Sequence, residues 1–211
     1  MVQEYALSFD RGRAKRLLVV PALFDEANRL RRFTVEVMRR LDGAGIDSLL
    51  PDFPGTNESL QALESQEPHD WIDAMAAAAR LFGAGHVLAL RGGCLFSPYS
   101  LPAIHYAPIK ASAILRQMLR ARMLAAREAG REETREGLME QALAHGIELA
   151  GYRLGPEFVR QFEPMQPRAQ DGITHVAQET VGGSGLWLRA EPGESRVQAD
   201  ALAAAVAVVL A

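Results

Sequence analysis

The sequence predicts an α/β fold, with a mostly parallel sheet flanked by helices. Short continuous apolar segments, which suit strands buried on both faces, alternate with longer amphipathic segments. Closely spaced glycines follow the first two amphipathic segments and would end two helices. Strands that alternate with helices in this way imply right-handed crossovers and parallel pairing.

The first predicted strand is Leu17–Val20, which ends at Pro21. Apolar residues at helical spacing follow it, so we expect a helix with Asp25 as its N-cap and Gly43 at its end. The segment Tyr5–Phe9 is a candidate edge strand.

The second and third strands are predicted at Ile46–Leu50 and His86–Leu90. Between them, Trp71–Phe82 has the periodicity of an amphipathic helix with Asp70 as its N-cap and Trp71 in the core.

The second half of the chain is partly helical. We expect it to contain a helical, cap-like segment at about 109–163 inside a single domain of residues 1–211. The closing helix would pack in the core or form a homodimer contact. The expected helices are 109–129, 132–144, 156–161 and 199–211, and the expected strands are 173–178 and Leu186–Ala190.

Composition excludes several classes of function. The 26 acidic and 23 basic residues give a net charge of −3, which argues against nucleic acid or an anionic membrane as the main partner. The single cysteine, Cys94, excludes an intrachain disulfide framework and a CxxC zinc site. No apolar run reaches the roughly 20 residues of a membrane span, and the N-terminus is unlike a signal peptide. These observations predict a soluble, cytoplasmic protein.

Four segments resemble the exosortase A system-associated hydrolases, most closely the second of two hydrolase types. In that family they correspond to a P-F-x-E-E-x-N-K-S-R-R stretch, an L-P-D-L-P-G strand end, the helix after the elbow, and a V-E-V-A-G-Y segment. In this chain they are Val20–Arg32, Leu50–Gly55, Ala107–Arg120 and Ile147–Tyr152. The resemblance implies an α/β-hydrolase-like fold and a setting of exopolysaccharide production and protein sorting in Gram-negative bacteria.

An α/β hydrolase carries its nucleophile on a strained G-x-S-x-G turn after a strand. The corresponding segment here is Ala89-Leu90-Arg91-Gly92-Gly93, so the small residues are present but arginine occupies the nucleophile position. Because a guanidinium stays protonated, Arg91 is neither an acyl-accepting nucleophile nor a useful base.

Three roles remain open for Arg91. Its side chain can pair with a local acid, for which Asp25, Glu26 and Asp52 are candidates. It can also bind an anion such as a carboxylate or phosphate, or take part in catalysis. In an anion-binding or acyl-binding pocket, the backbone N–H groups of Leu23, Phe24 and Gly92 would stand where a hydrolase keeps its oxyanion hole, with Asp52 and His105 nearby.

Two residues are weak catalytic candidates. Cys94 follows the elbow near the start of a helix, where a thiol can become a nucleophile, although its apolar neighbours favour a buried, inert thiol. His175 is the base best placed by chain order, since the histidine of an α/β hydrolase comes late. No metal-ligand spacing, P-loop or dinucleotide fingerprint occurs, so no metal or cofactor is expected.

The sequence therefore leaves two main functions, besides a structural scaffold in which protein side chains fill the pocket. One is an α/β-hydrolase-like protein acting on ester or acyl bonds without a serine nucleophile. The other is a non-catalytic accessory protein that holds an anionic or acyl ligand, or a partner, through the Arg91 pocket.

Overall fold

The computed structural model describes residues 3–169 and 171–211, and its centre is a six-stranded sheet of order β1-β3-β2-β4-β5-β8. Only β1 pairs antiparallel, and the other strands of this sheet are parallel, which confirms the predicted fold class. The strands are β1 (Ala6–Phe9), β2 (Arg16–Val20), β3 (Asp47–Pro51), β4 (His86–Leu90), β5 (Ala103–Tyr106) and β8 (Ile173–Val176).

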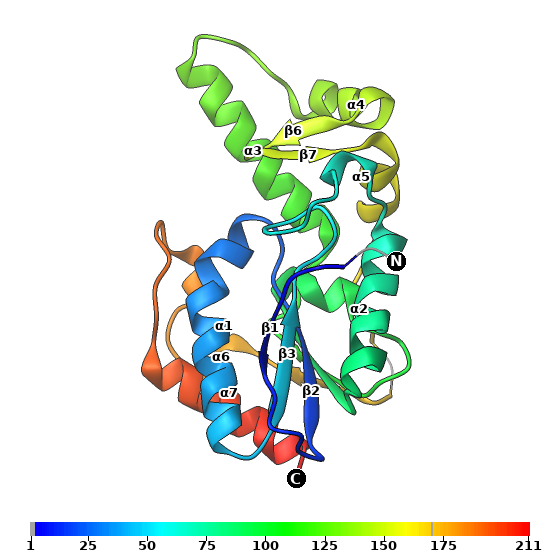
Figure 1. The fold of residues 1–211 in the computed structure, drawn as a ribbon. Coiled ribbons are helices and arrows are strands. Elements are labelled where there is room, and N and C mark those ends of the chain that lie inside the picture. The colour runs from blue at the N-terminus through cyan, green and yellow to red at the C-terminus, as the bar shows by residue number, and fades with distance from the viewer. Residues whose placement is uncertain (1–2, 170) are drawn as a thin grey trace.

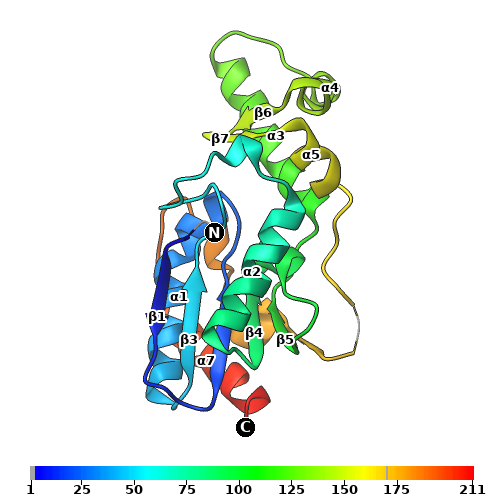
Figure 2. The same ribbon diagram turned by 45° about the vertical axis from the view of Figure 1, so that its right-hand side comes forward.

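Helices cover both faces of the sheet (Figures 1 and 2). On one face, α1 (Asp25–Gly43) packs with α7 (Arg196–Val209), and α6 (Gln178–Val181) lies beside α7. The other face is covered by α2 (Pro68–Phe82), the 3-10 helix η2 (Arg91–Phe96) and the first turns of α3 (Ala111–Glu128). Each helix buries one apolar stripe, as its sequence periodicity predicts.

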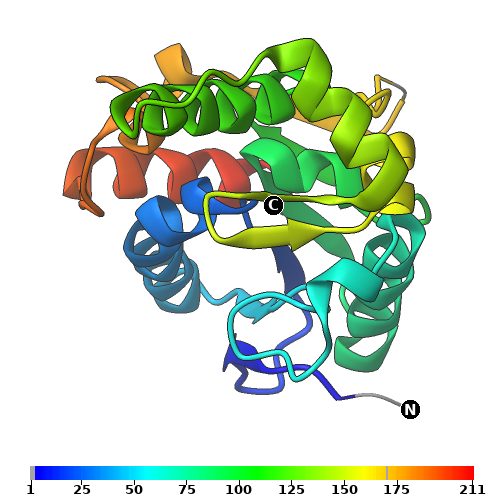
Figure 3. The same cartoon turned by 90° about the horizontal axis from the view of Figure 1, so that it is seen from above.

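Beyond the carboxyl ends of the parallel strands lies a second layer, formed by the chain between β5 and β8 (Figures 1 and 3). It contains α3, α4 (Arg135–His145), the hairpin of β6 (Ile147–Leu149) and β7 (Tyr152–Leu154), and α5 (Pro156–Phe162). We call this layer the cap.

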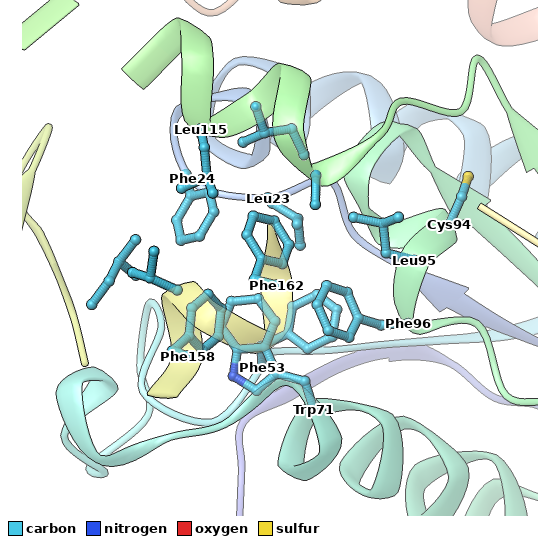
Figure 4. Close-up of a cluster of buried hydrophobic side chains, with 14 of the residues drawn as sticks. Leu23, Phe24, Phe53, Trp71, Cys94, Leu95, Phe96, Leu115, Phe158 and Phe162 are labelled. Atoms are coloured by element: carbon cyan, nitrogen blue, oxygen red, sulfur yellow. The ribbon is translucent and has the colours of Figure 1, made fainter. Parts of the chain in front are cut away.

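An aromatic cluster joins the cap to the sheet (Figure 4). Trp71 of α2 stacks on Phe53 at 4.5 Å between ring centroids and contacts Phe158 of α5 at 5.1 Å. The indole nitrogen of Trp71 donates to the Pro54 carbonyl at 2.9 Å, so its one polar atom is satisfied in the core.

Three sequence predictions differ from the structure. Leu186–Ala190 is not a strand: Leu186–Leu188 form the 3-10 turn η3, and Leu188 is exposed, because the adjoining glycines and a single buried leucine cannot fill a buried strand. Asp25 is the first residue of α1 rather than its cap, and Phe24 is the cap. Asp70 is likewise inside its helix, where it forms a capping box with Glu67.

No helix among the described residues is long and apolar enough to cross a bilayer.

Candidate functional site

The turn after β4 has the strained backbone of a nucleophile elbow. Arg91 has φ +54°, which is uncommon for a residue with a side chain. Gly93 lies so close to the end of the neighbouring strand β2 that a Cβ atom there would be 2.2 Å from the Pro21 carbonyl oxygen. The sharp turn predicted after β4 is therefore present, and Arg91 is its strained residue.

The Arg91 side chain is held by a bidentate ion pair. Its Nε donates to Glu26 Oε2 at 3.0 Å, and its Nη2 donates to Glu26 Oε1 at 2.9 Å. Its Nη1 donates to the Ala107 carbonyl at 2.9 Å. Only 9% of the Arg91 side chain and 14% of the Glu26 side chain are exposed, so the pair is largely withdrawn from water.

An indole ring covers the guanidinium. The Cζ of Arg91 lies 3.9 Å from the ring centroid of Trp187 in η3, a cation–π contact. Arg29 donates from Nη1 to the Trp187 carbonyl at 3.1 Å, which fixes this turn against α1. Of the three acids that the sequence offered as partners, Glu26 is the one that pairs with Arg91. The pairing and the stacking leave Arg91 little capacity to bind an added anion.

The same helix, α1, connects the other segments that resemble one family. Asn28 lies 3.4 Å from the Tyr152 hydroxyl of the β6–β7 hairpin. Arg31 pairs with Asp52 at 3.2 Å. Asp52 is fully buried and also accepts from Asn57 at 2.9 Å, so it holds the loop after β3. The segments are thus parts of one contact network around the elbow.

A pocket of about 280 Å³ lies above the ion pair, between α1, α3, the β6–β7 turn and η3. Its floor is formed by Leu23, Phe24 and Glu26. Most of the wall is apolar, and the charged groups at its edge are Asp25 and Arg29. The remaining lining residues are Ile114, Gln117, Met118, Ala121, Ala150, Trp187 and Leu188.

Two residues of the pocket lining have backbone N–H groups without a protein acceptor in the described part of the chain. The N–H groups of Leu23 and Phe24 have no acceptor among residues 3–169 and 171–211. Phe24 has φ +53°, another strained position. Gly92 packs below, where a Cβ would lie 2.8 Å from side-chain atoms of Leu23 and Ile114. Leu23 and Phe24 therefore line the pocket, whereas Gly92 packs against Leu23 and is not part of the lining.

Cys94 lies in η2, away from this pocket. It is fully buried, and its Sγ donates to the Ala89 carbonyl at 3.3 Å. Burial raises the pKa of the thiol well above its usual range, so the thiolate that a nucleophile needs is disfavoured. Figure 4 shows Cys94 at the margin of the apolar cluster.

His105 and His175 are partners across β5 and β8, with ring centroids 5.7 Å apart. His105 is fully buried, and neither ring nitrogen has a hydrogen-bond partner in the described part of the chain. Burial, with the positive fields of His175 and Arg168, lowers the His105 pKa to about 4. Neither histidine lines the pocket above Arg91.

The structure thus brings together Arg91, Gly92, Leu23 and Phe24, and it places Asp52, Cys94, His105 and His175 elsewhere. Sequence reasoning missed Trp187, which was expected in the core of a strand, and the α3 residues that line the pocket. The apolar periodicity of α3 could have indicated Ile114 and Met118, but not that they face the elbow. Among the described residues, no group of three metal-ligating side chains occurs.

Comparisons with solved structures give an α/β-hydrolase fold. The chain superposes on mouse alpha/beta hydrolase domain-containing protein 10 with a TM-score of 0.60 and 10% identity, over 97% of this chain and 92% of that one. Est1E from Butyrivibrio proteoclasticus, solved with ferulic acid, gives 0.53 and 14% identity, over 77% and 67% of the two chains.

The bottromycin epimerase BotH, solved with bottromycin A2, gives a TM-score of 0.51 and 16% identity, over 98% of this chain and 94% of that one. A hydrolase domain-containing protein and an epimerase thus share the fold, so the fold by itself does not specify the reaction. No protein-family model matches the chain, and no curated protein matches its sequence significantly.

Proposed function

We propose that this protein is a non-catalytic member of the α/β-hydrolase fold that binds a small acyl compound in the pocket above Arg91. The observation that carries the proposal is the ion pair of Arg91 with Glu26 at the elbow. A reacting serine or cysteine would have to stand at this position, with a histidine and an acid in hydrogen-bond reach.

The pocket supports an uncharged acyl ligand better than an anion. An anion would face the carboxylates of Asp25 and Glu26, against Arg29 as the one cation among the described lining residues, and the Arg91 charge is already balanced. A carbonyl oxygen would accept from the N–H groups of Leu23 and Phe24, which have no acceptor among the described residues. The apolar tail would pack against Met118 and the other apolar wall residues.

The resemblance supports a cellular setting. Glu26, Asn28, Arg31 and Tyr152 belong to the segments that resemble exosortase A system-associated hydrolases, and each contacts another part of the site. We therefore assign the protein an accessory role in the cytoplasm of a Gram-negative bacterium that makes exopolysaccharide.

Acyl hydrolysis is the second candidate. The elbow backbone and the two donors at the pocket floor favour it, because both are features of an acyl-transfer site. It would require a nucleophile other than residue 91.

The experiment has two arms. The first measures hydrolysis of short-chain nitrophenyl esters by the wild type and by the Arg91→Ala and Cys94→Ala variants, and we expect no turnover above the buffer blank. The second titrates the protein with octanamide and with octanoate and follows the fluorescence of Trp187, which lines the pocket. We expect saturable binding that is tighter for octanamide.

A matched pair of variants controls the binding arm. Ala121→Phe fills the pocket from α3 and should abolish binding, whereas Ala125→Phe is one turn further along the same helix and outside the pocket. Both positions are exposed, so neither change disturbs the core. Turnover that disappears with Cys94→Ala, or octanamide binding that survives Ala121→Phe, would contradict the proposal.

A further inference from the structure

Positive charge is concentrated in one segment of the chain. Residues 109–131, which include α3, contain six basic residues and one acidic residue, a net charge of +5. Since the whole chain has a net charge of −3, the remaining residues carry −8. The small overall charge therefore conceals a strong separation of charge.

Three arginines of this segment form one exposed stripe. Arg116, Arg120 and Arg127 lie on α3 at spacings of four and seven residues, opposite the side that is buried. None of them has an acidic partner within 4 Å in the part of the chain that the structure describes. Arg122 differs, because it lies on another side of α3 and pairs with Glu133 at 2.8 Å.

An apolar side chain lies beside the stripe. Leu124 is 59% exposed and follows Arg120 by one turn of α3. Figure 1 shows that this end of α3 projects away from the sheet, and Figure 3 shows α3 along the margin of the molecule. We call Arg116, Arg120, Leu124 and Arg127 the α3 face.

We propose that the α3 face binds the surface of an anionic lipid membrane. Its unpaired arginines complement negative headgroups, and Leu124 can enter the headgroup region. The acidic remainder of the protein is repelled by the same surface, which orients the molecule with α3 toward the lipid. The complementarity between three unpaired arginines and anionic headgroups is the observation that favours a lipid surface as the partner.

This orientation also positions the ligand pocket. Gln117 and Ala121 of α3 line the pocket and lie between the stripe and the core. The pocket edge would then lie beside the membrane surface. Membrane binding by the α3 face does not depend on what the pocket binds. The membrane proposal and the pocket-ligand proposal can therefore fail separately.

The test is flotation with lipid vesicles. Wild-type protein should bind vesicles of equal parts phosphatidylglycerol and phosphatidylcholine at low salt, should be released at high salt, and should not bind pure phosphatidylcholine. The variant R116Q/R120Q/R127Q should bind more than tenfold more weakly, since each arginine near an anionic surface contributes about fivefold. Leu124→Ser, made in the wild-type protein, should also weaken binding to these vesicles.

A second triple variant, R39Q/R80Q/R196Q, removes the same charge from exposed positions on α1, α2 and α7. It should bind as the wild type does, and the ellipticity of both triple variants should be unchanged. The proposal is wrong if wild type does not float with phosphatidylglycerol vesicles, if it floats equally with pure phosphatidylcholine, or if both triple variants lose binding equally. The nitrophenyl-ester and octanamide measurements, done without lipid, test the pocket independently.

Discussion

The guanidinium of Arg91 and the carboxylate of Glu26 form two parallel hydrogen bonds, Nε to Oε2 at 3.0 Å and Nη2 to Oε1 at 2.9 Å. The pair links the turn after β4 to the first turn of α1. The pair therefore fixes the Arg91 side chain against α1.

Removal of Arg91 should destabilise the fold. Arg91→Met leaves the Glu26 carboxylate largely buried without a partner, and we expect a loss of about 3 kcal/mol or more in the free energy of unfolding. The double variant Arg91→Met, Glu26→Gln should lose less than the sum of the two single variants. Urea unfolding of all four proteins measures this coupling.

The exposed pair of Arg153 and Glu148 is the control. Its side chains are 71% and 54% exposed, so Arg153→Ala should cost less than about 1 kcal/mol. Strictly additive effects at positions 91 and 26 would contradict a stabilising pair.

Cys94 should be unreactive in the native protein. Its thiol is buried, donates to Ala89, and has a raised pKa, so a chromogenic disulfide reagent should not modify it at neutral pH. One thiol per chain should react as soon as guanidinium unfolds the protein. Rapid reaction of the folded protein would show that the thiol is accessible and would revive it as a nucleophile.

His105 should make stability fall in mild acid. Its pKa is lowered from the ordinary 6.5 to about 4, mainly by burial. Below pH 6.5 the unfolded chain binds a proton that the folded protein refuses until about pH 4, so the free energy of unfolding decreases as pH falls through this window. Between about pH 7.5 and about pH 5 the loss from this group is about 2 kcal/mol.

His105→Phe should remove that part of the pH dependence. It should cost little stability at neutral pH, since the ring nitrogens that it deletes have no hydrogen-bond partner. Urea unfolding at several pH values measures both, and an unchanged slope in His105→Phe would contradict the assignment.

Gly93 should tolerate no side chain. A Cβ there would meet the Pro21 carbonyl oxygen at 2.2 Å and the Val20 carbonyl oxygen at 2.8 Å, and both belong to backbone that cannot yield easily. We expect Gly93→Ala to lower the free energy of unfolding by about 3 kcal/mol or more. A Cβ at Gly85 would meet no atom within 4 Å, so Gly85→Ala should leave the free energy of unfolding nearly unchanged. Thermal unfolding of both variants measures the difference.

The parallel sheet and the elbow could be predicted because they depend on local patterns. The apolar segments before Pro21 and before Arg91 are short and continuous, which is typical of strands buried on both faces. The identity of the residue at the elbow followed from the spacing of Ala89 and Gly93 alone. Glu26 was among three possible partners, and only the packing of α1 on the sheet selects it.

Other elements depend on contacts that no local pattern records. The strand β5, Ala103–Tyr106, was not predicted because it is short and carries His105 at a buried position. The β6–β7 hairpin consists of two three-residue strands with exposed residues on one side. Trp187 stacks on Arg91 because η3 lies against α1. The sequence around Trp187 resembles a strand, so this contact could not be predicted from it.

The interlocked elbow also limits how the site can change. Replacing Arg91 with serine would supply a hydroxyl, but it would leave the carboxylate of Glu26 without its counter-charge and Trp187 without the guanidinium that stacks on its ring. Neither histidine of β5 and β8 lines the pocket to serve as a base. Arg91→Ser alone is therefore expected to destabilise the fold without bringing His105 or His175 into the pocket.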